Sequence, residues 1–290
     1  MFDNIFAAIE KWMRELLTGM VESNMSTMFT DVNEKTSEIA TQVGRTPQNW
    51  NSSVFSMIQN LSESVVVPIA GIIITLVLCY ELISMLTERN NLHDVDTWMF
   101  FKYFVKAWVA IYLVSNTFTI TMAVFDVGQS VVNSASGIIN GGTAIDVSSL
   151  SMQMQAAMAT MEIGELVVLA LETFLVSFCM KIMSVVITVI VYGRMIEIYL
   201  YTSLAPIPFA TMSNREWGHV GTNYFRGLFA LAFQAFLMMV CVAIYAALIS
   251  SVRISSNMHS ALIGVAAYTV ILCFSLMKTG SLSKQIFGSH

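Results

Sequence analysis

The stretch that decides the fold is residues 166–203, which read LVVLALETFLVSFCMKIMSVVITVIVYGRMIEIYLYTS and are apolar with few interruptions. An α-helix of about 20 such residues crosses a hydrocarbon core of about 30 Å, at about 1.5 Å per residue. The stretch is therefore too long for one perpendicular crossing and barely long enough for two. Because no glycine or proline marks a central turn, we expect one long or tilted helix that extends past the bilayer, with a broken pair of segments as the alternative.

The composition of the whole chain points to the same environment. Of its 290 residues, 56% are hydrophobic and only 11% are charged, whereas a soluble domain carries roughly 25% charged residues. So little charge cannot coat a soluble globule of this size. The apolar blocks predict an all-α, polytopic transmembrane protein with about five spans, at residues 65–87, 101–127, 166–203, 228–250 and 261–277.

Two polar regions lie outside these spans. Residues 1–64 begin with apolar side chains at helical spacing, which predicts an N-terminal amphipathic helix that lies in a membrane interface or packs on protein. Residues 128–165 are rich in Ser, Gly and Met and contain no Lys or Arg, which predicts a loop followed by an amphipathic helix. We therefore divide the chain into an N-terminal region, 1–64, and a transmembrane domain, 65–290, with the loop 128–165 inside it.

Basic residues are distributed unequally between alternate links. One side collects Arg89, Lys102, Lys106, Arg194, Arg215, Arg226, Lys278 and Lys284, and the other collects Lys11, Arg14, Lys35, Arg45 and Arg253. The first group lies in short links and near span ends, where the positive-inside rule applies. The prediction is a multi-pass protein of the cell membrane whose N-terminus and 128–165 loop are extracytoplasmic and whose C-terminus is cytoplasmic.

Four polar side chains inside the predicted spans are the candidates for a role in mechanism or assembly: Glu81, Glu172, Lys181 and Gln234. Ionisable groups in a bilayer are costly and are functional candidates by default. Glu81 and Lys181 are predicted at similar depth in spans of the same direction, so they are candidates for an intramembrane pair. The alternative is that each charge faces a polar interhelical contact and matters mainly for assembly. The Gln234 amide needs an interhelical partner.

The most distinctive run is residues 204–238, LAPIPFATMSNREWGHVGTNYFRGLFALAFQAFLM. Its prolines should end the long helix, its asparagine can cap the next helical turn, Arg and Trp suit a membrane interface, and its glycines permit close approach. We take the run as a cytoplasmic turn formed by Pro206, Pro208, Asn214, Arg215, Trp217, Gly218, Gly221 and Arg226.

No catalytic pattern is present in the sequence. The chain has no GxxxxGK[ST] phosphate loop, no HExxH zinc site and no GxSxG elbow, and its four histidines are scattered in links and tail. The four cysteines lie in apolar blocks without a CxxC partner, as small packing residues do. We therefore expect a non-enzymatic protein with no catalytic residues, no cofactor and no metal site.

The run 204–238 resembles the TrbL-like polytopic conjugal transfer proteins, in the branch found in conjugative elements of Gram-positive bacteria. The matched features are the APIPFAT turn, the SNREWG link, the GxNYFR run and the AFQ at the start of the next span. Five spans, an outside N-terminus and an inside C-terminus are also the layout of this family.

The resemblance implies a membrane channel or platform subunit of a type IV secretion system, which moves single-stranded DNA with its relaxase between cells. It implies a homo-oligomer, in the form of a ring, beside ATPases and other secretion subunits, with transient contact to the DNA–relaxase substrate and no small-molecule substrate. The alternatives are a stand-alone secondary transporter or another membrane scaffold protein. Secondary transporters usually contain inverted repeats, whereas the two halves of this chain are dissimilar.

Overall fold

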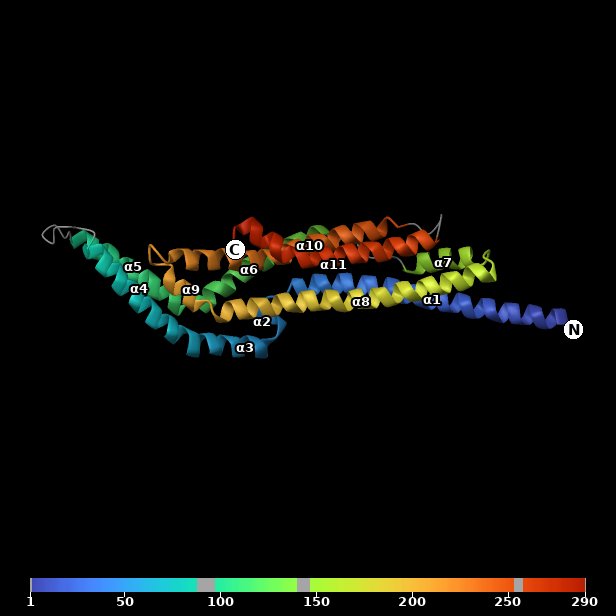
Figure 1. Cartoon of the computed structure of the whole chain (residues 1–290), viewed down its shortest axis with the longest axis horizontal. Helices are drawn as coiled ribbons and strands as arrows, with labels where there is room; N and C mark the ends of the chain where they lie inside the picture. Colours follow the sequence, from blue (N-terminus) through green and yellow to red (C-terminus); the bar gives the residue numbers. More distant parts are fainter. Residues whose placement is uncertain (1, 88–96, 140–146, 253–257, 290) are drawn as a thin grey trace. The chain divides into compact units, whose positions relative to one another are not determined.

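The structure, a computed structural model, describes residues 2–87, 97–139, 147–252 and 258–289, and every regular element in these ranges is a helix (Figure 1). The all-α prediction is therefore confirmed. The elements are α1 (Phe2–Val43), α2 (Pro47–Trp50), α3 (Ser52–Leu61), the π-helix η1 (Ser62–Val66), α4 (Val67–Thr87), α5 (Thr97–Ser115), α6 (Thr117–Ile139), α7 (Val147–Met158), α8 (Ile163–Ser203), α9 (Pro206–Thr211), α10 (Gly218–Ser250) and α11 (Met258–Phe287).

In the described ranges, five helices are long and apolar enough to cross a membrane, as the sequence predicts. The candidates are Ser52–Thr87, which joins α3, η1 and α4, then α5, α8, α10 and α11. The helix α8 is unbroken over 41 residues, which at about 1.5 Å per residue is about twice the thickness of a hydrocarbon core. The predicted link 88–96, with Arg89, and the predicted outside residue Arg253 lie outside the described residues.

The structure divides the predicted helix 101–127 in two. α5 ends at Ser115 and α6 begins at Thr117, and Figure 1 shows the chain changing direction between them. Thr117 Oγ1 donates to the carbonyls of Leu113 and Val114, each at 2.8 Å. Such bonds from a side chain to the preceding turn bend helices. α6 then continues to Ile139, so residues 128–139, which the composition suggested as loop, are helical.

The N-terminal region also contains more helix than its composition suggested. α1 is a single helix of 42 residues, although its second half is rich in Ser, Thr, Asn and Glu. Buried apolar side chains recur along that half at helical spacing: Val21, Met25, Met28, Phe29, Val32, Ile39 and Val43. Burial of this one face stabilises a helix whose composition alone would not.

The chain forms two compact units, to which α8, α10 and α11 each contribute a part. Unit 1 contains Met1–Val43, Ser134–Val191 and Met238–Lys278, and unit 2 contains Gly44–Asn133, Tyr192–Leu237 and Thr279–His290. In unit 1, α1 lies along α8. It also contacts the turn before α8, where Arg14 Nη1 donates to the carbonyl of Met161 at 2.8 Å.

Unit 2 contains two buried apolar clusters. One joins the start of the first candidate span to α6, α8 and α10, through Ile58, Phe118, Phe125, Met195, Ile198, Tyr199, Leu228 and Leu231. The other joins α4, α5 and α9, through Ala70, Ile74, Leu78, Ala110, Val114, Phe209 and Ala210. The second cluster supports the polar site described next, because it fixes α9 against the α4–α5 pair.

Candidate functional site

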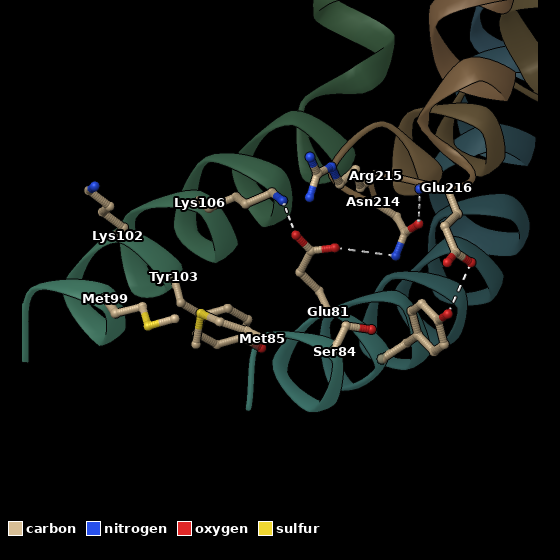
Figure 2. A pocket seen from close by; sticks show the side chains of 11 residues that line it. Glu81, Ser84, Met85, Met99, Lys102, Tyr103, Lys106, Asn214, Arg215 and Glu216 are labelled. Carbon is tan, nitrogen blue, oxygen red and sulfur yellow. Dashed lines mark hydrogen bonds and ion pairs between the residues drawn. The ribbon is translucent and has the colours of Figure 1, made fainter. Parts of the chain in front are cut away.

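A polar pocket lies in unit 2, between the last turns of α4, the first half of α5 and the turn that leads into α10 (Figure 2). Its volume is about 250 Å³. It combines three cationic and two carboxylate side chains with aromatic, amide and thioether groups: Tyr80, Glu81, Ser84, Met85, Met99, Lys102, Tyr103, Lys106, Asn214, Arg215 and Glu216.

Glu81 is the centre of this pocket. Figure 2 shows its carboxylate between two partners from different elements: the ammonium of Lys106 on α5 and the amide of Asn214 in the turn. The Asn214 Nδ2 to Glu81 Oε2 distance is 3.4 Å. Only 21% of the Glu81 side chain is exposed, against 42% of the Lys106 side chain. One carboxylate therefore connects α4, α5 and the turn.

Asn214 holds the turn in the conformation that starts α10. Its Oδ1 accepts hydrogen bonds from the backbone N–H groups of Glu216, at 2.7 Å, and Trp217, at 3.0 Å. An asparagine at a helix start satisfies N–H groups that would otherwise have no partner. Asn214 itself is buried, so both ends of its amide are used inside the protein.

A second set of contacts joins the same turn to α4. The ring of Tyr80 stacks on that of Trp217, with centroids 5.4 Å apart and an interplanar angle of 21°. The Tyr80 hydroxyl donates to Glu216 Oε2 at 3.0 Å. Trp217 is therefore held by an aromatic partner, and Arg215 lies at the exposed side of the turn.

The prolines and glycines of the motif shape the turn from within. α8 ends at Ser203, and Pro206 occupies the first turn of the short helix α9, where its missing N–H costs little. A side chain at Gly221 would meet Pro208 O at 2.5 Å, and one at Gly218 would meet Met212 O at 3.2 Å. α10 can therefore pack closely against α9 because Gly221 lacks a Cβ, whereas a Cβ at Gly218 would require only a small shift of Met212. Arg226 follows as an exposed residue of α10.

Another group of polar contacts in unit 2, partly buried, joins helices further along the chain. Gln234 Nε2 on α10 donates to Thr279 Oγ1 on α11 at 3.4 Å, which gives this amide an interhelical partner. Arg194 on α8 is only 7% exposed and donates from Nη2 to the carbonyl of Leu231 at 3.3 Å. Glu197 pairs across to Lys284 on α11 at 3.1 Å. These contacts bind α8, α10 and α11 to one another.

The remaining predicted charges lie in unit 1. Glu172 on α8 pairs with His259 near the start of α11. Lys181 is exposed on α8, and no hydrogen bond or ion pair of its side chain is found within the described ranges. The structure thus pairs Glu81 with Lys106 of its own unit instead of with Lys181.

Sequence reasoning missed two partners. Lys106 was placed among the basic residues near span ends, and His259 in a link, because nothing near either residue in the sequence indicates its distant partner. A weak signal existed for the first: Glu81 and Lys106 lie six to nine residues from the two ends of one short link, so an antiparallel pair of helices brings them to similar height.

The polar groups of the site hold the turn before α10 in a fixed position. Its central carboxylate is neutralised by an adjacent ammonium and accepts an amide hydrogen bond, and the second carboxylate accepts a phenolic O–H. Among the described residues, no group of three or more His, Cys, Asp or Glu could hold a metal ion. These contacts connect α4, α5 and the turn, and they leave the Arg215 side of the turn exposed.

These features define a polytopic helical membrane protein. Comparison with protein families finds that residues 32–206 match the model of the TrbL/VirB6 plasmid conjugal transfer like protein family. The match covers more than half of the chain, so the chain belongs to this family. It is therefore a conjugal transfer subunit of a type IV secretion system, associated with other subunits of that machinery.

The family match and the sequence motif cover different parts of the chain. The matched range ends at Pro206, so most of the run 204–238 lies outside it. The family is thus supported by residues other than those that first suggested it. Comparison with curated proteins and with solved structures finds no match.

Proposed function

We propose that this chain is a non-enzymatic channel or platform subunit of a conjugative type IV secretion machine, assembled as a homo-oligomeric ring in the cell membrane. Its partners are further copies of itself, the lipid bilayer and other secretion subunits, including ATPases on the cytoplasmic side. The exposed turn around Arg215 would then face these cytoplasmic partners.

The observation that carries this proposal is how the ionisable groups of the candidate spans are used. Glu81 pairs with Lys106, Glu172 with His259, and Glu197 with Lys284. Each pair joins two different helices. Charges used in this way fix helix packing, as an assembly subunit requires.

The charge of the chain supports transient contact with DNA. Its formal net charge is −5, and the cations that line the pocket lie beside two carboxylates that also line it. Tight binding of nucleic acid needs several unopposed lysines or arginines for the phosphates. A conduit wall without such a patch lets a polyanion pass without holding it.

Mass measurement of the protein purified in mild detergent tests the proposal. We expect a discrete homo-oligomer, and images of it should show a central lumen. In cells that carry the conjugative element, deletion of the gene should abolish transfer, and the full-length chain should restore it. A stable monomer that binds a small solute would instead favour the secondary transporter.

A further inference from the structure

The second half of α1 has two faces of opposite character. From Val21 to Val43 its buried side chains are apolar and lie on one side of the helix. The exposed side chains on the opposite side are all polar: Ser23, Ser26, Thr27, Thr30, Glu34, Ser37 and Thr41. They recur at intervals of three and four residues, so they form one continuous strip. We call these seven residues the polar strip.

This half of α1 runs parallel to α8 inside unit 1. Asn24 Nδ2 donates to Thr173 Oγ1 at 3.5 Å, and further along Lys35 Nζ donates to Thr188 Oγ1 at 3.2 Å. Ser177 Oγ also donates to the carbonyl of Asn24 at 3.1 Å. The offset between the paired residues varies by only one helical turn, from 149 to 153, so α1 accompanies α8 through the most apolar part of that candidate span.

α8 carries an exposed apolar band at the same level. Leu171, Phe178, Val185 and Val189 are 62%, 57%, 64% and 66% exposed. A patch of this kind is what a helix presents to lipid, and water would disfavour it. If this part of α8 lies in the bilayer, α1 lies there as well. The Thr27 hydroxyl bonds to the carbonyl of Ser23 in its own helix, but a carboxylate such as that of Glu34 is costly in hydrocarbon, so the polar strip then needs water.

Lys181 supplies an independent observation. On a helix of 3.6 residues per turn, Lys181 lies at the border between the side of α8 that contacts α1, with Ser177 and Thr188, and the apolar band, with Phe178 and Val185. Its side chain is exposed in the middle of the apolar run. An ammonium at that depth is costly in lipid, and a long side chain at this border can extend past α1 toward water.

We propose that α1 crosses the bilayer alongside α8, and that its polar strip together with Lys181 lines a water-filled lumen enclosed by copies of this chain. The inference rests on the proposed ring, since one copy of α1 encloses nothing. It replaces the expectation that all of residues 1–64 lie outside. Because α1 and α8 run in the same direction, the chain between them must then cross the bilayer an odd number of times. α4, α5 and α6 therefore supply one or three crossings, and not the two predicted for residues 65–87 and 101–127. Residues beyond Val43 then lie on the side where α8 ends, in agreement with the hydrogen bond from the Tyr199 hydroxyl to the carbonyl of Pro47, at 2.6 Å in unit 2.

A lumen lined by the polar strip and Lys181 would let a hydrated polyanion pass. Within the strip Glu34 is the one charged side chain, and Lys181 opposes its sign. The other members are serines and threonines, which hydrogen-bond water and offer no cluster of cations to hold phosphates.

Cysteine accessibility in cells that carry the whole transfer machine tests the inference. The background variant lacks the native Cys79, Cys179, Cys241 and Cys273 and must still support transfer. Single cysteines then replace Ser23, Thr30 or Ser37 in the strip, and Phe178 or Val185 in the apolar band as matched controls. Because the thiolate is the reacting form and forms poorly in lipid, a charged, membrane-impermeant thiol reagent should modify the strip about tenfold or more faster than the band. Modification of Thr30→Cys should also reduce DNA transfer.

Two single cysteines at the ends of α1 test the crossing itself. Lys11→Cys should react with an impermeant reagent added outside the cell, and Gln48→Cys should not. Reaction of both from outside overturns the inference, as does fast reaction of both the strip and the band, which would place this part of α8 in water. Slow reaction of the strip also overturns it, because the strip would then be covered by protein. Each of these results leaves the oligomer and transfer measurements of the proposed function unaffected.

Discussion

At the scale of single residues, the sharpest constraint in the motif is the missing side chain of Gly221. A Cβ there would lie 2.1 Å from Met212 Cγ and 2.5 Å from Pro208 O. The Met212 side chain can move, but the carbonyl belongs to α9 and cannot yield without shifting that helix. We expect Gly221→Ala to cost roughly 1–3 kcal/mol of stability, as overpacking does elsewhere, and to lower the unfolding temperature measured in detergent.

Gly264→Ala in α11 is the matched control for this change. No atom lies within 4 Å of a Cβ built at Gly264, so the substitution adds helix propensity without a clash. Its unfolding temperature should equal or exceed that of the parent. Equal effects of the two substitutions would mean that close approach of α9 and α10 is not what Gly221 provides.

The Glu81–Lys106 pair should behave as a coupled unit. Glu81→Gln leaves the Lys106 ammonium without this carboxylate, and Lys106→Met leaves the carboxylate without this ammonium. Because Lys106 is 42% exposed, water screens part of the interaction, and we expect a coupling free energy of roughly 0.5–1 kcal/mol. A double-mutant cycle on thermal unfolding measures it.

Lys102 provides the comparison for that cycle. It lies one turn before Lys106 on α5, and its ammonium lies 5.6 Å from the centroid of the Trp98 ring. Lys102→Met combined with Glu81→Gln should therefore be additive. Coupling of similar size in both cycles would show that the effect is general electrostatics of the pocket and not a specific pair.

Some features of single residues depend only on nearby positions in the sequence, and others depend on how distant helices pack. The capping role of Asn214 and the close approach at Gly221 depend on neighbours within a few positions, so a motif can suggest them. The partners of Glu81 and Glu172 depend on how distant helices align, and no local pattern encodes that alignment. For this reason the sequence suggested Lys181 as the partner of Glu81, whereas the structure shows Lys106.

At the scale of elements, the division between α5 and α6 arises from side chains that compete with the helix backbone. Asn116, Thr117 and Thr121 all bond to carbonyls of the preceding turn. Their apolar neighbours have the periodicity of one span, so hydrophobicity alone predicts a continuous helix from residue 101 to 127. The bend is an effect of three polar side chains on that helix.

Removal of these side chains should straighten the pair. In the variant Asn116→Leu, Thr117→Val, Thr121→Val, we expect the distance between spin labels at Phe104 on α5 and Val127 on α6 to lengthen by several ångströms. Both positions are exposed, so labels there disturb no core. Thr119→Val, an exposed threonine of the same helix, should leave the distance unchanged. A distance that stays constant in the triple variant would place the cause of the bend in packing.

For the whole molecule, apolar length predicted the helical class and the five candidate spans, because both follow from hydrocarbon thickness and backbone hydrogen bonding. The organisation into two compact units did not follow from the sequence. α8, α10 and α11 each contribute to both units, so no linker or change of composition marks the boundary. The packing of the polar half of α1 on α8 was equally hidden, since its composition resembles that of a solvent-exposed region.

Orientation in the membrane is the prediction that belongs to this scale. Most basic residues of the side predicted to be cytoplasmic fall in unit 2: Lys102, Lys106, Arg194, Arg215, Arg226 and Lys284. Lys11, Arg14 and Lys35, from the opposite group, fall in unit 1. Because short basic segments are retained in the cytoplasm during insertion, we expect the turn before α10 inside and the turn before α8 outside.

Single cysteines at two exposed positions distinguish the two orientations. Thr160 lies just before α8, and His219 lies in the first turn of α10. With the native cysteines removed, an impermeant reagent should label Thr160→Cys in intact cells and His219→Cys only after the membrane is opened. Labelling of His219→Cys from outside would reverse the orientation, and the turn that carries Arg215 would then face away from cytoplasmic ATPases. Labelling of both from outside would mean that α8 does not cross the bilayer, since only α8, the six-residue helix α9 and short turns separate the two positions.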